Sequence, residues 1–81
     1  MKLPRDLSGE KLARLLRRFG YEITRQTGSH MRLTSGIKNF EHHLTIPTHK
    51  QLNVGTLAQI LTDAASYLEM TREQLAEELF R

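Results

Sequence analysis

Residues 21–47 of this 81-residue chain, YEITRQTGSHMRLTSGIKNFEHHLTIP, carry the pattern that decides the fold. Apolar and polar residues alternate in three short runs, at residues 21–26, 30–34 and 41–46. Alternation with a period of two is typical of strands covered on one face. Turns at Gly28 and Gly36 are short enough to join neighbouring strands antiparallel, and Pro47 ends the third run. The stretch therefore predicts a three-stranded antiparallel meander.

The alternation also assigns each strand residue to a face of the predicted sheet. The residues expected to face the core are Tyr21, Ile23, Met31, Leu33, Leu44 and Ile46. The residues expected on the opposite, open face are Glu22, Thr24, Gln26, His30, Arg32, Thr34, His43 and Thr45.

Helical patterns flank the three strands. Apolar residues at helical spacing predict a helix over residues 8–19 with Ser8 as N-cap, and a second over residues 54–68 after the N-cap Asn53. Thr71 is a candidate N-cap of a short third helix, and Gln74 occupies the position where a capping box has Glu or Gln. We predict an α+β fold of order α-β-β-β-α-α, in which the helices cover one face of the sheet and bury every apolar stripe.

Length and composition set bounds on the class of protein. Residues 1–81 are expected to form a single domain. The chain has no cysteine, which excludes disulfides and thiolate zinc sites. It has no apolar run of about 20 residues to span a membrane, and no signal-peptide core. A cytoplasmic protein without a membrane partner is the expectation.

The charge is distributed unevenly along the chain. Residues 1–39 carry a net charge of +6 and residues 40–81 a net charge of −3. Lys11, Arg14 and Arg18 fall roughly opposite the apolar stripe of the first predicted helix. A basic half favours a polyanionic partner, with RNA or DNA ahead of a membrane, against the alternative of an ordinary solvated surface.

The triplet Gly28-Ser29-His30 places a histidine at the first position of the second strand, directly after a tight turn. Histidine changes charge nearest to neutral pH, so it can take a proton from an RNA 2′-hydroxyl or give one to a leaving oxygen. Arg32 projects from the same face and Arg25 lies across the hairpin, where both can hold a phosphate. His30 is therefore the candidate catalytic residue, against the alternative of a surface histidine.

Other chemistry finds little support in the sequence. His42 and His43 are neighbours on a strand and point to opposite faces, whereas a zinc site needs three or four converging ligands. The chain has no HExxH motif, P-loop, dinucleotide fingerprint or nucleophile elbow. We expect no metal and no cofactor, and we expect His43 and His49 to be exposed bystanders.

An ordered set of landmarks resembles the HicA family, the toxins of HicAB toxin–antitoxin modules, also described as YcfA-like. The landmarks are Phe19-Gly20-Tyr21, Gly28-Ser29-His30, Pro47, His49, Gly55-Thr56-Leu57, Ile60-Leu61 and residues 71–75. They span almost the whole chain in the same order. The resemblance implies a fold similar to a double-stranded-RNA-binding domain and the activity of an mRNA interferase, a ribonuclease that arrests translation.

The resemblance also implies site residues and partners. The catalytic histidine of the family motif corresponds to His30, and the partner is a HicB-type antitoxin. In double-stranded-RNA-binding domains the first helix, the first hairpin loop and the start of the last main helix contact RNA. The corresponding places hold Lys11, Arg14 and Arg18 on the first helix, Gly28, Ser29 and His30 in the hairpin loop, and residues 53–56 at the start of the last main helix, whose free amides can bind phosphate. Arg25, Arg32 and Lys50 complete the predicted RNA-binding residues. The free toxin is expected to be a monomer that acts on mRNA.

Two alternatives stay open at this point. One is a non-catalytic RNA-binding module of the same fold. The other is a protein-interaction adaptor whose basic face meets an acidic partner.

Overall fold

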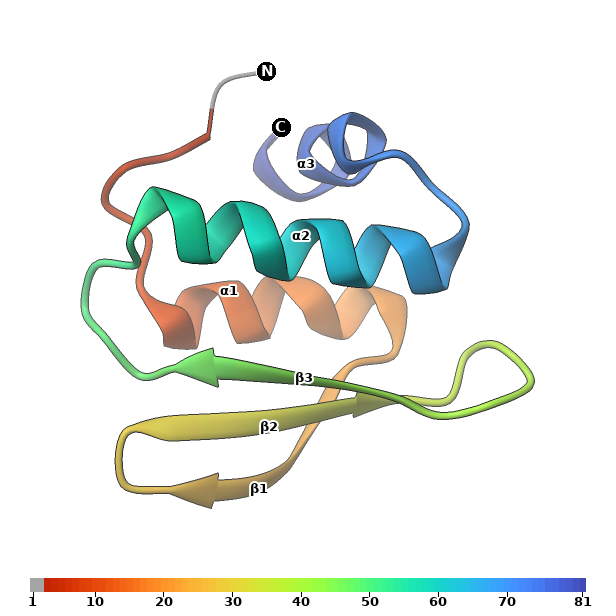
Figure 1. Ribbon diagram of the computed structural model, residues 1–81, viewed down its shortest axis with the longest axis horizontal. Coiled ribbons are helices and arrows are strands. Elements are labelled where there is room, and N and C mark those ends of the chain that lie inside the picture. The colour runs from red at the N-terminus through yellow and green to blue at the C-terminus, as the bar shows by residue number, and fades with distance from the viewer. Residues whose placement is uncertain (1–2) are drawn as a thin grey trace.

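The computed structural model describes residues 3–81, and its elements follow the predicted order (Figure 1). The elements are α1 (Gly9–Leu16), η1 (Arg17–Phe19), β1 (Glu22–Thr27), β2 (His30–Ser35), β3 (His42–Pro47), α2 (Val54–Leu68) and α3 (Arg72–Phe80). The predicted α+β class and α-β-β-β-α-α order are confirmed. Met1 and Lys2 lie outside the described residues, and Lys2 is one of the basic residues counted above.

The three strands form one antiparallel sheet in the order β1-β2-β3, and helices cover one of its faces. Both α1 and α2 pack against the sheet, and α3 packs against α2. Leu33 and Ile46 are fully buried on the covered face, as predicted. Ile23, also predicted to face the core, is instead 49% exposed, as are all residues of β1 to varying degrees.

A β-bulge in β1, between Ile23 and Arg25, changes which side chains share a face. An extra residue in one strand shifts the alternation of every residue after it. Gln26, which simple alternation places on the open face, is paired with buried Met31, so that prediction is wrong. Arg25 is instead the residue directly opposite Arg32, and the two arginines share the open face.

The predicted helix caps are confirmed by hydrogen bonds. Ser8 Oγ accepts from the main-chain N–H of Lys11 over 3.0 Å, and Asn53 Oδ1 accepts from Gly55 over 2.7 Å. Thr71 and Gln74 form both hydrogen bonds of a capping box. These bonds satisfy N–H groups that have no partner within the helix, and they fix where each helix begins.

Both main helices begin at the end of the sheet that carries the β1–β2 turn, on the left in Figure 1. The loop that follows β3 joins the elements at this end. Its His49 carbonyl accepts from Gly9 N over 3.0 Å, and its Leu52 N–H donates to Leu7 over 2.8 Å. The first turn of α1 is thereby held against the end of the sheet.

Candidate nucleic-acid interface

His30 occupies the first position of β2, directly after the turn. Gly28 has a φ of +43°, a conformation that side chains other than glycine rarely adopt, and a Cβ there would meet no atom within 4 Å. The Ser29 carbonyl accepts from Thr48 N over 2.9 Å, which ties the turn to the loop after β3. His30 is exposed, and its Nδ1 lies 3.1 Å from Ser29 Oγ. The histidine is thus presented to solvent from a fixed backbone.

Two arginines lie beside His30 on the open face of the sheet. Arg32 follows it by two residues on β2, and Arg25 is the residue opposite Arg32 on β1. Within residues 3–81, neither arginine forms an ion pair with a carboxylate. Like charges placed directly opposite each other repel, so an anion bound between them is favourable. The open face therefore carries a cationic position that a phosphate fits.

The start of each main helix adds positive potential to the His30 end of the sheet. The N-terminal ends of α1 and α2 carry the positive ends of their helix dipoles. Lys50 is exposed in the loop between β3 and α2 at the same end. This end of the molecule is suited to an anionic ligand that also reaches the imidazole of His30.

The cations of α1 lie on a different surface. Lys11 and Arg14 are exposed on the helix layer, on the opposite side of the sheet from His30. Arg18, in η1, donates to the main-chain carbonyl of Glu78 over 2.7 Å and lies 3.4 Å from its carboxylate. The residues predicted for RNA therefore divide into an open-face group around His30 and a helix-layer group, and Arg18 also holds α3 in place.

The remaining histidines have separate environments. His42 Nδ1 lies 2.8 Å from Tyr21 Oη, and its ring stacks on Tyr67 at 4.8 Å between centroids. His43 points to the open face, so the predicted divergence of the two neighbours is confirmed. Burial and the nearby Tyr67 and Asp63 raise the pKa of Tyr21 well above its usual value, so its phenol stays neutral. In residues 3–81, no three His, Asp or Glu side chains gather as metal ligands would.

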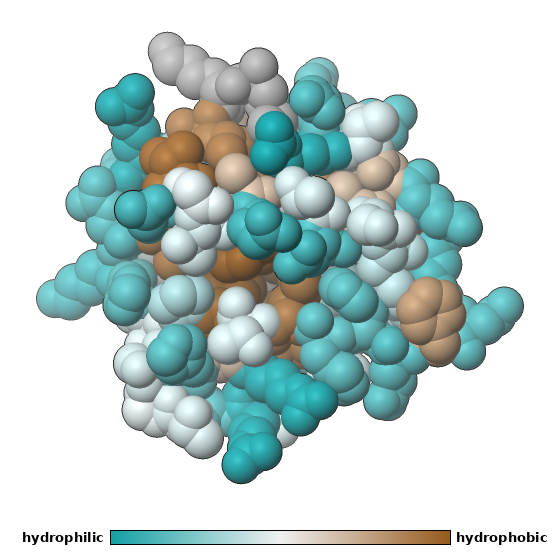
Figure 2. Space-filling model, viewed as in Figure 1, coloured by the Kyte–Doolittle hydropathy of each residue, from teal (hydrophilic) through white to brown (hydrophobic). Residues whose placement is uncertain are grey.

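The opposite end of the sheet, on the right in Figure 1, holds a cavity of about 710 Å³. Its lining residues are Ile37, Lys38, Asn39, Phe40, His42, Asp63, Ser66, Tyr67 and Glu69. Figure 2 shows an isolated hydrophobic patch at that edge of the molecule. The β2–β3 loop lies there, and its Ile37 and Phe40 side chains are 56% and 64% exposed to solvent. Because His30 lies at the other end, this cavity is separate from the candidate site.

Tyr67 organises the β2–β3 loop, and its replacement by phenylalanine should destabilise the protein. Its hydroxyl accepts from Lys38 N over 3.0 Å and lies within hydrogen-bond distance of the carbonyls of Ser35 and Phe40. Tyr67 is 7% exposed, so the lost partners are not replaced by bulk water. We expect Tyr67→Phe to lower the free energy of unfolding by about 1–3 kcal/mol in denaturant titrations. An unchanged midpoint would show that the loop does not depend on this hydroxyl.

One group on the open face was missed by sequence reasoning. Thr24, Thr34 and His43 form a hydrogen-bonded chain across all three strands. Alternation placed all three on the open face. Only the register between strands shows that they touch, because Thr34 is paired with His43 and the bulge brings Thr24 to Thr34.

Comparison with known proteins identifies the family. A family model described as the HicA toxin of bacterial toxin–antitoxin systems matches residues 9–65, more than half of the chain. The matched segment includes the whole sheet and the Gly28-Ser29-His30 turn. The chain therefore belongs to the HicA toxin family, whose members are the toxin partners of antitoxins. Searches of curated proteins and of solved structures find no match.

No helix described in residues 3–81 is long and apolar enough to cross a membrane.

Proposed function

We propose that this HicA-family toxin is an endoribonuclease, an mRNA interferase that cuts mRNA and arrests translation. The observation that supports the proposal most directly is the exposed His30 on a fixed turn, beside two arginines that form no ion pair with any carboxylate of residues 3–81. Family membership supports the toxin role independently of that geometry. An RNA-binding module without catalysis would need the arginines but would have no use for an oriented imidazole.

His30 would act as general base or general acid at a scissile phosphodiester. The contact from Ser29 Oγ to Nδ1 holds the ring and leaves Nε2 to face the substrate. Arg32 and Arg25 would hold the phosphate, and the turn residues Gly28 and Ser29 let the RNA backbone approach closely. One positioned acid or base contributes typically 10²–10⁴-fold to the rate, enough for damaging but slow cleavage. No metal ion or cofactor takes part in this scheme.

The remaining predicted residues would have supporting roles. Lys50 would contact RNA at the His30 end, and Lys11, Arg14 and Arg18 would raise the local concentration of RNA from the helix layer. The toxin would act in the cytoplasm, where it would meet mRNA. A HicB-type antitoxin would block a monomeric toxin.

The proposal is tested by incubating the purified chain with an mRNA, with and without a chelator of divalent metal ions. We expect fragments under both conditions, and growth arrest when the chain is induced in bacteria without its antitoxin. Binding without fragments would support the non-catalytic RNA-binding alternative. Fragments only in the absence of the chelator would contradict a metal-independent reaction.

The arginine pair makes a separate prediction about RNA binding. Arg25→Gln/Arg32→Gln should weaken binding and reduce the slope of log K against log salt by about 0.7 for each lost phosphate contact to a single strand. The matched control is Lys11→Gln/Arg14→Gln, which removes two charges from the helix layer and should change the slope less. The opposite ranking, measured by fluorescence anisotropy over a salt series, would move the main RNA contact to α1.

A further inference from the structure

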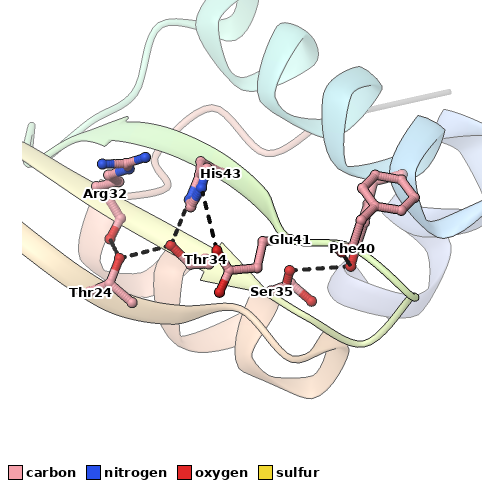
Figure 3. A network of polar contacts seen from close by, with 8 residues as sticks. Thr24, Arg32, Thr34, Ser35, Phe40, Glu41 and His43 are labelled. Carbon is pink, nitrogen blue, oxygen red and sulfur yellow. Dashed lines mark hydrogen bonds and ion pairs between the residues drawn. The ribbon is translucent and has the colours of Figure 1, made fainter.

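The open face of the sheet carries a hydrogen-bonded chain that the proposed reaction does not use (Figure 3). Thr24 Oγ1 donates to the main-chain carbonyl of Arg32 over 3.3 Å and lies 2.8 Å from Thr34 Oγ1. Thr34 Oγ1 lies 2.8 Å from Nδ1 of His43. The chain holds the ring of His43 in one orientation while its side chain stays 40% exposed.

The direction of this chain assigns the proton of His43. A carbonyl can only accept and a hydroxyl has a single hydrogen. The one direction that satisfies all three contacts has Thr24 donating to the carbonyl of Arg32, Thr34 donating to Thr24, and Nδ1–H of His43 donating to Thr34. Neutral His43 therefore carries its hydrogen on Nδ1, and the lone pair of Nε2 is directed away from the chain.

The group that faces Nε2 limits what can bind there. Glu41 Oε1 lies 4.0 Å from Nε2, and the Glu41 side chain is 73% exposed. Two acceptors separated by this distance do not bond to each other, and a phosphate offers them only further acceptor oxygens. A hydroxyl group can donate to Nε2. The ribose 2′-hydroxyl is the donor that RNA has and DNA lacks.

The position of His43 relative to His30 is compatible with one bound RNA strand. His30, Arg32 and Thr34 share the open face of β2, and His43 is paired with Thr34. Four residues of a strand span roughly 13 Å, so the two imidazoles cannot act on the same phosphodiester. The pair of Arg32 and Arg25 lies between them. A strand cut at His30 would cross the arginine pair and bring a ribose to His43.

We propose that His43 is a substrate-binding residue that accepts a hydrogen bond from a ribose 2′-hydroxyl of a single RNA strand lying along the open sheet face. The proposal rests on the proposed ribonuclease function, since it assumes that RNA is the substrate. His43 then gives the toxin a preference for RNA over DNA at a position remote from the reacting bond. Thr34 and Thr24 position the ring.

The test compares binding of oligouridine and oligodeoxyuridine of equal length to the His30→Ala protein, in which the RNA stays intact. We expect that protein to prefer the ribose oligomer. Adding His43→Ala should weaken oligouridine binding roughly 3- to 10-fold, the effect of one hydrogen bond, and leave oligodeoxyuridine binding unchanged. Thr34→Val should reduce the preference in the same direction. The matched control is Thr45→Val, on the same face but outside the chain, which should keep it.

Several outcomes would overturn the inference. The first is that the His30→Ala protein shows no preference for the ribose oligomer. The second is that adding His43→Ala lowers the affinity for both oligomers equally, and the third is that it lowers neither affinity. Failure of the proposed function gives a different result. If the protein prefers the ribose oligomer but never cuts mRNA, only the proposed nuclease activity is contradicted. If the protein cuts mRNA and the His43→Ala variant keeps the full ribose preference, only the proposed role of His43 is contradicted.

A second measurement does not depend on any variant's stability. Oligouridine added to labelled protein should shift the ring NMR signals of His43 more than those of His42, which is stacked on Tyr67 on the covered side. Oligodeoxyuridine should shift the His43 signals less. Equal shifts from both oligomers would contradict recognition of the 2′-hydroxyl.

Discussion

Replacing His30 by alanine should lower the rate of RNA cleavage by roughly 10²–10⁴-fold, the contribution of one positioned acid or base. The affinity for RNA should change little, because Arg25 and Arg32 on the same face are untouched. Folding should also be preserved, since His30 is exposed and its side-chain contact is with the neighbouring Ser29. The measurements are fragment formation from a labelled mRNA, RNA affinity and the thermal midpoint.

The matched control for this substitution is His49→Ala. His49 is an exposed histidine in the loop after β3, and this loop uses its main-chain carbonyl to hold Gly9. Removing its imidazole should leave cleavage within about twofold of the original protein, a change of under 0.5 kcal/mol in the barrier. If His30→Ala folds and cuts RNA as fast as His49→Ala, the catalytic assignment of His30 is wrong.

Gly9→Ala should destabilise the protein by roughly 3 kcal/mol, the upper part of the range for overpacking. A Cβ on Gly9 would lie 1.8 Å from the carbonyl oxygen of Pro47 and 3.2 Å from Ile46 Cγ2. Alanine favours a helix over glycine by about 1 kcal/mol, so without this clash the change would be stabilising. Because displacing main-chain atoms is energetically costly, α1 must move away from the end of β3 to relieve the clash.

The consequence of Gly9→Ala reaches the candidate site. Pro47 is paired with His30, so a displaced β3 end also shifts the strand position that presents the imidazole. We expect the thermal midpoint to fall by about 10–20 °C for a domain of this size. Gly36→Ala is the matched control, because a Cβ there meets no atom within 4 Å. Equal midpoints for the two variants would show that α1 tolerates the added methyl group.

Local sequence patterns predict much of the fold. Ser8, Asn53 and Thr71 cap their helices as predicted, because a capping residue acts on N–H groups two or three positions away. The strand faces of β2 and β3 follow from the alternation of side chains. The family landmarks also follow from sequence, since a family model recognises residue order rather than contacts.

The candidate site was only partly accessible from sequence. His30 and Arg32 share a face because they are two residues apart on one strand. Arg25 joins them only through the β-bulge, which no residue pattern indicated. Arg18 was predicted to bind RNA, and in the structure it also donates hydrogen bonds to Glu78. Because Glu78 lies 60 positions further along the chain, no local pattern indicates this contact.

For this chain, the sequence alone determined the order of helices and strands, the turn that presents His30 and the family. These depend on interactions within a few residues, which a linear pattern records. Only the tertiary structure decided that Arg25 faces Arg32, that Gly9 must lack a side chain, and that His43 is held by Thr34. Each of these depends on which strands pair and in what register, and register is set by the packing of the whole sheet against its helices.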